Sequence, residues 1–285
     1  MRNITLLLMA LFLTVCCGRS GSDRAAEIVE EWQGKEIKLP AAMTNVMTGD
    51  TINVADADFT ILTYVDSIGC TKCKMKLPIW KEFLGSLDSI ADSDVRFLMV
   101  VNSSDFKELQ YIFKSNAFEY PVFADVENLV DKANNLPEET AFRTFLLDRN
   151  KKVVAIGSPV YSTQMGKLYK SIISGQMSVS QRTGDAVTVS ENMVNLGTLR
   201  PRETARHEIE FTNSGNDTVR IDKTVSSCEC TELSFQKKII PPQSQVKATL
   251  IFSGDTIAGD FERTIHVYYK DFEYPTIINV SGNIQ

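Results

Sequence analysis

The sequence predicts two domains, an α/β domain followed by an all-β sandwich. The chain has 285 residues, and a single hydrophobic core rarely grows beyond roughly 250 residues. Between residues 58 and 176, segments rich in β-branched and aromatic residues alternate with segments of helical apolar spacing, which is typical of an α/β sheet. Between residues 185 and 285 only short strand-like segments occur, separated by turn residues. The polar stretch at residues 177–184 is the predicted linker.

The composition is that of a folded, mildly acidic protein. Hydrophobic residues make up 43% and charged residues 23% of the chain, which excludes the low-hydrophobicity, high-charge composition of disordered chains. The formal net charge is -6, whereas nucleic-acid phosphates are bound by clustered Lys and Arg. We therefore predict no nucleic-acid partner.

The N-terminal segment has the pattern of an export signal. Residues 4–15 form an apolar run that is shorter than the roughly 20 residues a membrane span needs. The run ends in Leu13-Thr14-Val15-Cys16, which resembles the lipobox of bacterial lipoproteins. This resemblance implies a signal peptide at residues 1–16 and a lipid anchor on Cys16, whereas the small residue before Cys17 favours Cys17 as the alternative. An ordinary signal peptide on a soluble periplasmic protein is the other interpretation.

Residues 17–57 are predicted to form an N-terminal helix and a lead-in to the first domain. The helix runs from Asp23 to Gln33 and ends at Gly34. Its partial apolar face consists of Ala26, Ile28, Val29 and Trp32. We interpret it as a spacer helix between the anchor and the first domain.

Two cysteines lie at the junction of a predicted strand and a predicted helix. Residues 59–65 are continuously apolar in character, as in a buried strand. Residues 71–87 have apolar residues at helical spacing, with Pro78 inside as a kink. Cys70 stands at the start of this helix, where free N–H groups and the helix dipole favour a thiolate. We therefore predict Cys70 as the attacking thiol and Cys73, one turn further in, as the resolving thiol.

Other side chains near the cysteines are given structural roles. Lys72, Lys74 and Lys76 add positive charge along a helix surface, where solvent screens it. Met75 could join the two thiolates in a soft copper site, but a Met at this position more often packs in the core. We predict no metal and no cofactor.

The rest of the first domain continues the alternation of strands and helices. The predicted strands cover residues 95–101, 121–124, 141–147 and 152–156, and the predicted helices cover residues 104–115, 128–135 and 162–174. The last two strands are joined by a turn at residues 148–151, so they add an antiparallel edge to the sheet.

The motif residues carry a resemblance to a known family. Cys70-Thr71-Lys72-Cys73-Lys74-Met75-Lys76-Leu77-Pro78 resembles the thioredoxin active-site run of Cys-x-x-Cys-Lys with a downstream Pro. The residues around Phe123-Ala124-Asp125 and Phe145-Leu146-Leu147-Asp148 are similar to the TlpA and peroxiredoxin-like branch of that family. The resemblance covers about residues 58–175 and implies a thioredoxin-like α/β domain with thiol–disulfide chemistry.

The sequence departs from this family before the first Cys, between the two cysteines and at the family's cis-Pro. Gly69 replaces the usual Trp before the first Cys, and Thr71-Lys72 replaces the usual dipeptide between the cysteines. Arg143 stands where the family has a cis-Pro beside the substrate strand. A cis bond before a residue other than Pro costs about 2.5 to 4 kcal/mol, so we predict a trans bond and a different docking edge. Arg143 is a candidate modulator, with a guanidinium that would lower the pKa of nearby thiols.

The second domain is predicted to be an immunoglobulin-like sandwich. Its strand-like segments cover residues 194–197, 207–211, 218–221, 246–252, 264–269 and 276–280, and about 100 residues with this spacing favour that fold. The runs 195–197, 211–215 and 226–231 resemble an uncharacterised immunoglobulin-like family of bacterial envelope proteins. His207 and His266 lie in alternating strands, so we assign them surface or strand-pairing roles and no site.

A second thiol pair, Cys228 and Cys230, lies in this domain. Residues two apart on a strand point to the same face with Cα atoms about 6.6 Å apart, near the upper limit of disulfide geometry. Bonding therefore requires a local bend. The alternatives are an easily reduced disulfide, a free thiol pair, or two cysteines that only fill a strand face.

The sequence-based hypothesis is a thiol-disulfide oxidoreductase-like protein of the bacterial cell envelope. It would face the periplasm and be held at the membrane by its lipid alone. Its partners would be thiols or disulfides of envelope proteins, or a redox partner protein. The alternative is a non-enzymatic envelope binding or scaffold protein with a degenerate thioredoxin fold.

We predict that the mature N-terminus is acylated. Mass spectrometry of membrane-fractionated protein should find an acylated N-terminal Cys, which we expect to be Cys16 and alternatively Cys17. An unmodified N-terminus in soluble wild-type protein would contradict the anchor.

Overall fold

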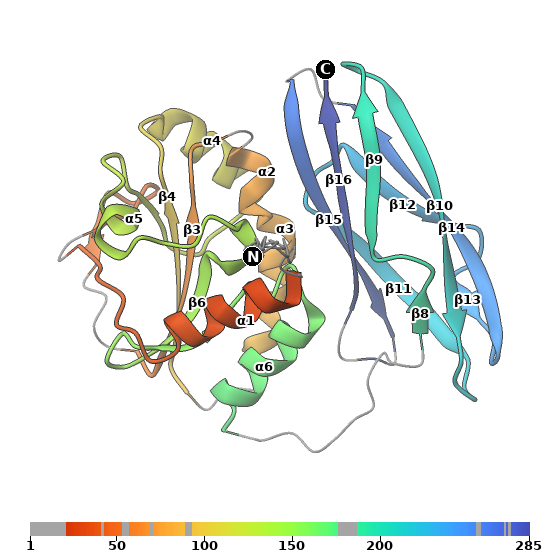
Figure 1. Ribbon diagram of the computed structural model, residues 1–285, viewed down its shortest axis with the longest axis horizontal. Helices are drawn as coiled ribbons and strands as arrows, with labels where there is room; N and C mark the ends of the chain where they lie inside the picture. Colours follow the sequence, from red (N-terminus) through yellow and green to blue (C-terminus); the bar gives the residue numbers. More distant parts are fainter. Residues whose placement is uncertain are drawn as a thin grey trace, which may run out of the picture.

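The computed structural model describes residues 21–40, 43–52, 57–68, 71–88, 93–175, 187–254, 258–270, 272 and 275–285. They form an α/β domain and an all-β domain that lie against each other (Figure 1). The predicted signal peptide, Cys70 and the predicted linker at residues 177–184 lie outside the described residues.

A five-stranded sheet of order β5-β4-β3-β6-β7 forms the centre of the first domain. Its strands are β3 (Phe59–Val65), β4 (Val95–Val101), β5 (Val122–Ala124), β6 (Thr144–Asp148) and β7 (Val153–Ile156). β3, β4 and β5 run parallel, whereas β6 and β7 add antiparallel pairs. The predicted α/β sheet with an antiparallel edge is confirmed. A separate pair of short strands, β1 (Met43–Thr44) and β2 (Thr51–Ile52), precedes it.

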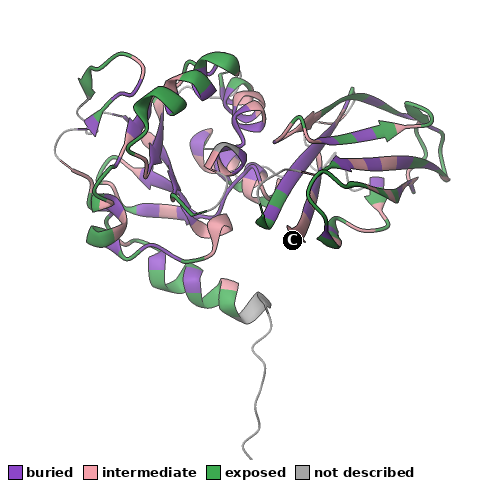
Figure 2. Cartoon of the chain, turned by 90° about the horizontal axis from the view of Figure 1, so that it is seen from above, coloured by how far each residue is buried: buried purple, intermediate pink, exposed green. Residues whose placement is uncertain are grey.

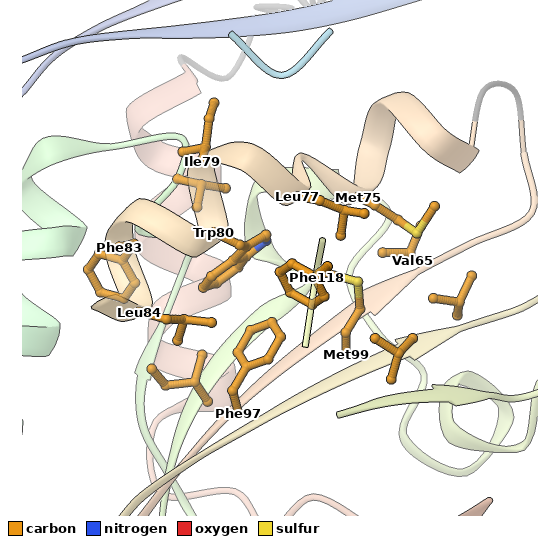
Figure 3. Packing of buried hydrophobic residues seen from close by; sticks show 14 of the residues in the cluster. Val65, Met75, Leu77, Ile79, Trp80, Phe83, Leu84, Phe97, Met99 and Phe118 are labelled. Carbon is orange, nitrogen blue, oxygen red and sulfur yellow. The ribbon is translucent and has the colours of Figure 1, made fainter. Parts of the chain in front are cut away.

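Helices cover both faces of this sheet, because every central strand is apolar on both sides. One face packs against α2 (Thr71–Met75), α3 (Leu77–Leu87), α4 (Phe106–Ser115) and α6 (Thr163–Ile173). The other packs against α1 (Gly21–Trp32) and α5 (Leu129–Asn134). Figure 3 shows the first face, where Leu77 and Trp80 lie over Phe97 and Met99. The Trp80 and Phe97 ring centroids are 4.9 Å apart.

The helix α1 belongs to the core, so its interpretation as a spacer is wrong. Ile28 and Trp32 are 2% and 1% exposed, and the Trp32 ring lies 5.0 Å from that of Phe145 on β6. In Figure 2 buried positions line one side of this helix, where it meets the sheet. A narrow apolar face is sufficient here because a single Trp buries a large area.

The predicted single helix over residues 71–87 is two helices. Lys76 has a left-handed backbone with φ 47°, which ends α2 at Met75 and starts α3 at Leu77. Pro78 lacks the N–H that would bond the carbonyl four residues earlier, and its ring clashes with that carbonyl. The chain therefore breaks before Pro78 instead of bending, and Ile79 and Trp80 both donate to the Lys76 carbonyl at 3.1 Å.

The second domain consists of two sheets that share one hydrophobic core. The four-stranded sheet has the order β12-β14-β10-β8, and the five-stranded sheet has the order β13-β11-β15-β16-β9. The strands are β8 (Val187–Val189), β9 (Met193–Leu199), β10 (Thr204–Asn213), β11 (Val219–Ser226), β12 (Thr231–Phe235), β13 (Ile239–Ile240), β14 (Ser244–Ser253), β15 (Gly259–Tyr269) and β16 (Thr276–Ile284). The expectation of an all-β domain is confirmed, with β8, β12 and β13 in addition to the predicted strands.

The outer face of the five-stranded sheet packs against the helices α2 and α3 (Figure 1). Val225 of β11 contacts the hydrophobic core of the first domain, and Lys223 forms an ion pair with Glu82 of α3. Thr163 of α6 donates to the Pro275 carbonyl at 2.9 Å. The interface therefore combines apolar and polar contacts on the side of the first domain that carries α2.

We predict that Trp32→Ala lowers the free energy of unfolding by about 3 to 5 kcal/mol, because it leaves a cavity beside the sheet. Urea unfolding followed by circular dichroism measures this. The control Val29→Ala, on the exposed side of the same helix, should change it by less than about 0.5 kcal/mol. A Trp32→Ala effect as small as that of Val29→Ala would mean that α1 does not stabilise the domain.

Candidate functional site

The Cys-x-x-Cys segment follows the central strand β3 of the first domain. Cys73 lies in α2, is 6% exposed and is disulfide-bonded. Its partner lies outside the described residues, since the other two described cysteines bond to each other. The fragment α2 has only five residues, so the long helix dipole expected to favour a thiolate is not present.

A carboxylate holds two cations beside this segment. Asp66, just after β3, accepts from Lys74 at 2.5 Å and from Arg143 at 2.5 Å. The Arg143 side chain also donates to the Pro137 carbonyl at 2.6 Å. The described residues contain no cis peptide bond, and Arg143 is trans as we predicted. The Arg143 guanidinium is therefore bound to the carboxylate at the end of β3, which it shares with Lys74.

Lys76 is buried between the two domains, so its expected place on a solvent-screened helix surface is wrong. The side chain is 0% exposed. Its Nζ donates to Oγ1 of Thr264 on β15 at 2.7 Å and lies 4.3 Å from the centre of the Tyr161 ring. The Thr264 hydroxyl in turn donates to Oδ1 of Asn279 at 3.0 Å. The hydroxyl and the ring partly replace the water that the ammonium group has lost.

Burial lowers the pKa of Lys76 to about 7, with Glu262 raising it and Arg263 lowering it to a smaller extent. Desolvation penalises the charged form of a lysine, which is the direction seen here. Both protonation states are therefore populated near neutral pH.

His266 lies at the same interface, so of the two predicted roles the surface position is wrong, whereas the residue does pair with Val225 and Ile277 of the neighbouring strands. It is 2% exposed, and its Nε2 donates to the Val160 carbonyl of the first domain at 2.8 Å. Burial lowers the pKa of His266 to about 4, although the hydrogen bond to the Val160 carbonyl acts to raise it. A neutral imidazole therefore joins the domains. His207 is partly exposed and pairs with Glu191.

The second thiol pair forms a disulfide. Cys228 and Cys230 are bonded to each other, with Cα atoms 5.1 Å apart. The two residues lie in the turn between β11 and β12, and this turn brings their Cα atoms closer than an extended strand would. Both residues are partly exposed.

Arg263 connects this disulfide with the domain interface. Its Nε donates to Sγ of Cys230 at 3.2 Å, and the next residue on β15 is Thr264, which binds Lys76. Cα atoms of α2 and β15 lie within 8 Å of each other. Both α2, which carries Cys73, and the Cys228–Cys230 turn therefore contact the same strand, β15.

A groove of about 800 Å³ is lined by residues of both domains. Its lining includes Thr140, Phe142, Met165, Met193, Arg263 and Val280. Within the part of the chain that the structure describes, no helix is long and apolar enough to cross a membrane. No group of three His, Cys, Asp or Glu side chains among the described residues is arranged to hold a metal ion.

Sequence reasoning missed Lys76, Asp66, Thr264 and Arg263. One signal was available for Lys76: Trp80 and Phe83 follow it at helical spacing, which puts it on the apolar face. Asp66 is an acidic residue directly after a buried strand. Nothing in the sequence indicates that Thr264 or Arg263 approaches the first domain.

Comparisons with known proteins describe the two halves separately. Residues 187–284 match the model of a family described as "Protein of unknown function (DUF1573)". No curated protein matches the chain.

Solved structures are similar at low identity. The thioredoxin domain of a thiol-disulfide oxidoreductase from Bacteroides vulgatus is 11% identical with a TM-score of 0.40, and covers 50% of this chain and 97% of that one. A putative protein disulfide isomerase from Bacteroides thetaiotaomicron is 16% identical with a TM-score of 0.39. The match covers 50% of this chain and 89% of that one. A protein of unknown function from Porphyromonas gingivalis is 16% identical with a TM-score of 0.31 over 34% of this chain, which spans 46% of that protein.

We predict that Lys76→Met stabilises the protein near pH 6 and loses this advantage as the pH rises. The Lys76 pKa is about 7 in the folded chain and about 10.5 when unfolded. Between these values the unfolded state binds the additional proton, so wild-type stability rises with pH there. The full pKa shift of Lys76 corresponds to a change of roughly 4 to 5 kcal/mol in the free energy of unfolding.

Urea unfolding of both proteins at about pH 6 and about pH 10 measures this difference. The control Ile79→Val, at an uncharged buried position of α3, should shift the stability equally at both pH values. A Lys76→Met effect that does not change with pH would show that the lysine keeps its ordinary titration.

Proposed function

We propose that this chain is a thiol-disulfide oxidoreductase-like protein of the bacterial envelope, in which Cys70 attacks and Cys73 resolves. The observation that carries the proposal is the disulfide-bonded state of Cys73 in α2, directly after the central strand of the sheet. Cys70 precedes it by three residues in the sequence and is the proposed bonding partner.

The reaction is two successive thiol–disulfide exchanges. The Cys70 thiolate attacks one sulfur of a substrate disulfide, forms a mixed disulfide and releases the first substrate thiolate. Cys73 then attacks Cys70, closes the pair and releases the second substrate thiolate. Two electrons pass from the protein to the substrate. The 6% exposure of Cys73 suits this second, internal step, in which no substrate sulfur has to reach it.

The fold assignments belong to the same proposal. The order of parallel and antiparallel strands in the first sheet supports a thioredoxin-like domain. Two sheets around one core support an immunoglobulin-like second domain. The Leu13–Cys16 segment supports a lipid anchor at Cys16 or Cys17 and a periplasm-facing position.

A second candidate function is envelope protein binding without catalysis. Two observations favour it: the second domain covers the side of the first domain that carries α2, and Arg143 replaces the Pro of the substrate strand. Partner proteins would then use the 800 Å³ groove, whose lining includes Phe142, Met165 and Met193.

An insulin-reduction assay with dithiothreitol separates these functions. We predict that Cys70→Ser abolishes reduction and that Cys73→Ser accumulates mixed disulfides, because it removes the resolving thiol. Cys70 should also alkylate faster than Cys73 at neutral pH. The control Ser67→Ala, an exposed side chain just before the motif, should retain the wild-type rate.

Two outcomes would favour the binding protein instead. One is a reduction rate that neither cysteine variant changes. The other is equal alkylation of Cys70 and Cys73, which would contradict the assignment of the nucleophile.

A further inference from the structure

The Cys228–Cys230 disulfide lies in the turn between β11 and β12, and Cys230 contacts Arg263 on β15, the strand that also contacts α2. We propose that the disulfide is a second redox site, which exchanges electrons with the Cys70 and Cys73 pair of the same chain. The role of the first pair rests on the proposed function, whereas the second site is argued from its own contacts.

Each sulfur of this disulfide has a hydrogen-bond donor directed at it. Arg263 Nε donates to Sγ of Cys230 at 3.2 Å, and the Cys230 backbone N–H donates to Sγ of Cys228 at 3.1 Å. Donors stabilise a thiolate far more than a neutral sulfur, and a guanidinium adds its charge. The site is therefore built to accept the charge that appears when the disulfide opens.

Hydrogen bonds hold the turn on both sides in addition to the disulfide. Ser227 donates to the Thr264 carbonyl at 2.9 Å, and Thr264 donates to Oγ of Ser227 at 2.9 Å. Ser253 donates to the Cys230 carbonyl at 2.8 Å. Opening and closing of the disulfide therefore need no refolding of the turn, as a reversible site requires.

The Cys70 and Cys73 pair is the dithiol to which we couple the second site. Cα atoms of α2 and β15 lie within 8 Å, and Lys76, three residues after Cys73, bonds to Thr264 at 2.7 Å. Thr264 is adjacent to Arg263 and hydrogen-bonded to Ser227, the residue before Cys228. Covalent attachment and this fixed interface keep the two pairs at high effective concentration.

The exchange balances without another reactant. The Cys70 thiolate attacks Sγ of Cys228 and releases the Cys230 thiolate beside Arg263. The Cys73 thiolate attacks Sγ of Cys70, which closes the first disulfide and releases the Cys228 thiolate. Two electrons move from the first pair to the second, and two protons pass by way of solvent from the first thiols to the second. Cys230 is the first leaving group because Arg263 contacts its sulfur.

Trapping in the full chain tests the pairing of the two sites. The double variant Cys73→Ser, Cys230→Ser retains Cys70 and Cys228, and the matched double variant Cys73→Ser, Cys228→Ser retains Cys70 and Cys230. After mild oxidation with glutathione disulfide, peptide mass spectrometry of monomeric protein should find the Cys70–Cys228 link at about tenfold the yield of the Cys70–Cys230 link. Absence of the Cys70–Cys228 link from the monomer, or equal yields of the two links, would overturn the exchange.

A redox titration tests the second site by itself. The fraction of Cys228 and Cys230 thiols is measured by alkylation in dithiothreitol buffers of graded potential. Arg263→Gln should require about a tenfold higher ratio of dithiol to disulfide for half reduction, because it removes a charged donor. Arg263→Lys, which keeps the charge, should lie between Arg263→Gln and wild type. An unchanged midpoint in Arg263→Gln would overturn the role of the arginine.

The two proposals fail in different ways. If Cys70→Ser leaves insulin reduction unchanged, the proposed function of the first pair fails. If insulin reduction depends on Cys70 but Cys228 and Cys230 stay oxidised while the first pair is reduced, only the second site fails.

Discussion

The burial of the Lys76 ammonium group between the two domains is the constraint on which the geometry around the cysteines depends. A cation removed from water needs a hydrogen-bond partner, and the Thr264 hydroxyl of the second domain supplies one at 2.7 Å. Pro78 prevents a continuous helix, and the left-handed turn at Lys76 separates α2 from α3. Thus one Pro and one buried Lys determine both the length of α2 and its contact with β15.

A short α2 changes the source of any thiolate stabilisation. The field of a helix grows as its peptide dipoles align, and a five-residue helix aligns few of them. Nearby cations are the other common source, but Asp66 already binds both Lys74 and Arg143. The cations beside the Cys-x-x-Cys pair are therefore both bound to one carboxylate, whereas Cys230 in the second domain contacts a guanidinium directly.

The parts of the fold that could be predicted from sequence are those determined by local pattern. β3 and β4 are continuous apolar runs, and Asp105 and Ser162 accept N–H bonds at the starts of α4 and α6, so these elements were found close to their true bounds. The burial of Lys76, His266 and Trp32 depends on which surfaces meet in three dimensions. An isolated His in an alternating strand gives no sign that the outer face of its sheet is covered. The Cys228–Cys230 pair was visible in the sequence, but its donor Arg263 is a neighbour only through the pairing of β11 with β15.

The alternation of β15 explains how one strand serves both domains. Successive side chains of a strand point to opposite faces, and Thr264 and His266 bond to the first domain. The opposite face of β15 carries Arg263, Ile265 and Val267. Of these, Ile265 and Val267 lie in the core of the second domain. Ladders with β11 and β16 fix the register on both sides. A slip by one residue would exchange the two faces and place Thr264 in the core. The hydrophobic core of the second domain therefore maintains both the bond to Lys76 and the position of Arg263 beside the Cys228–Cys230 disulfide.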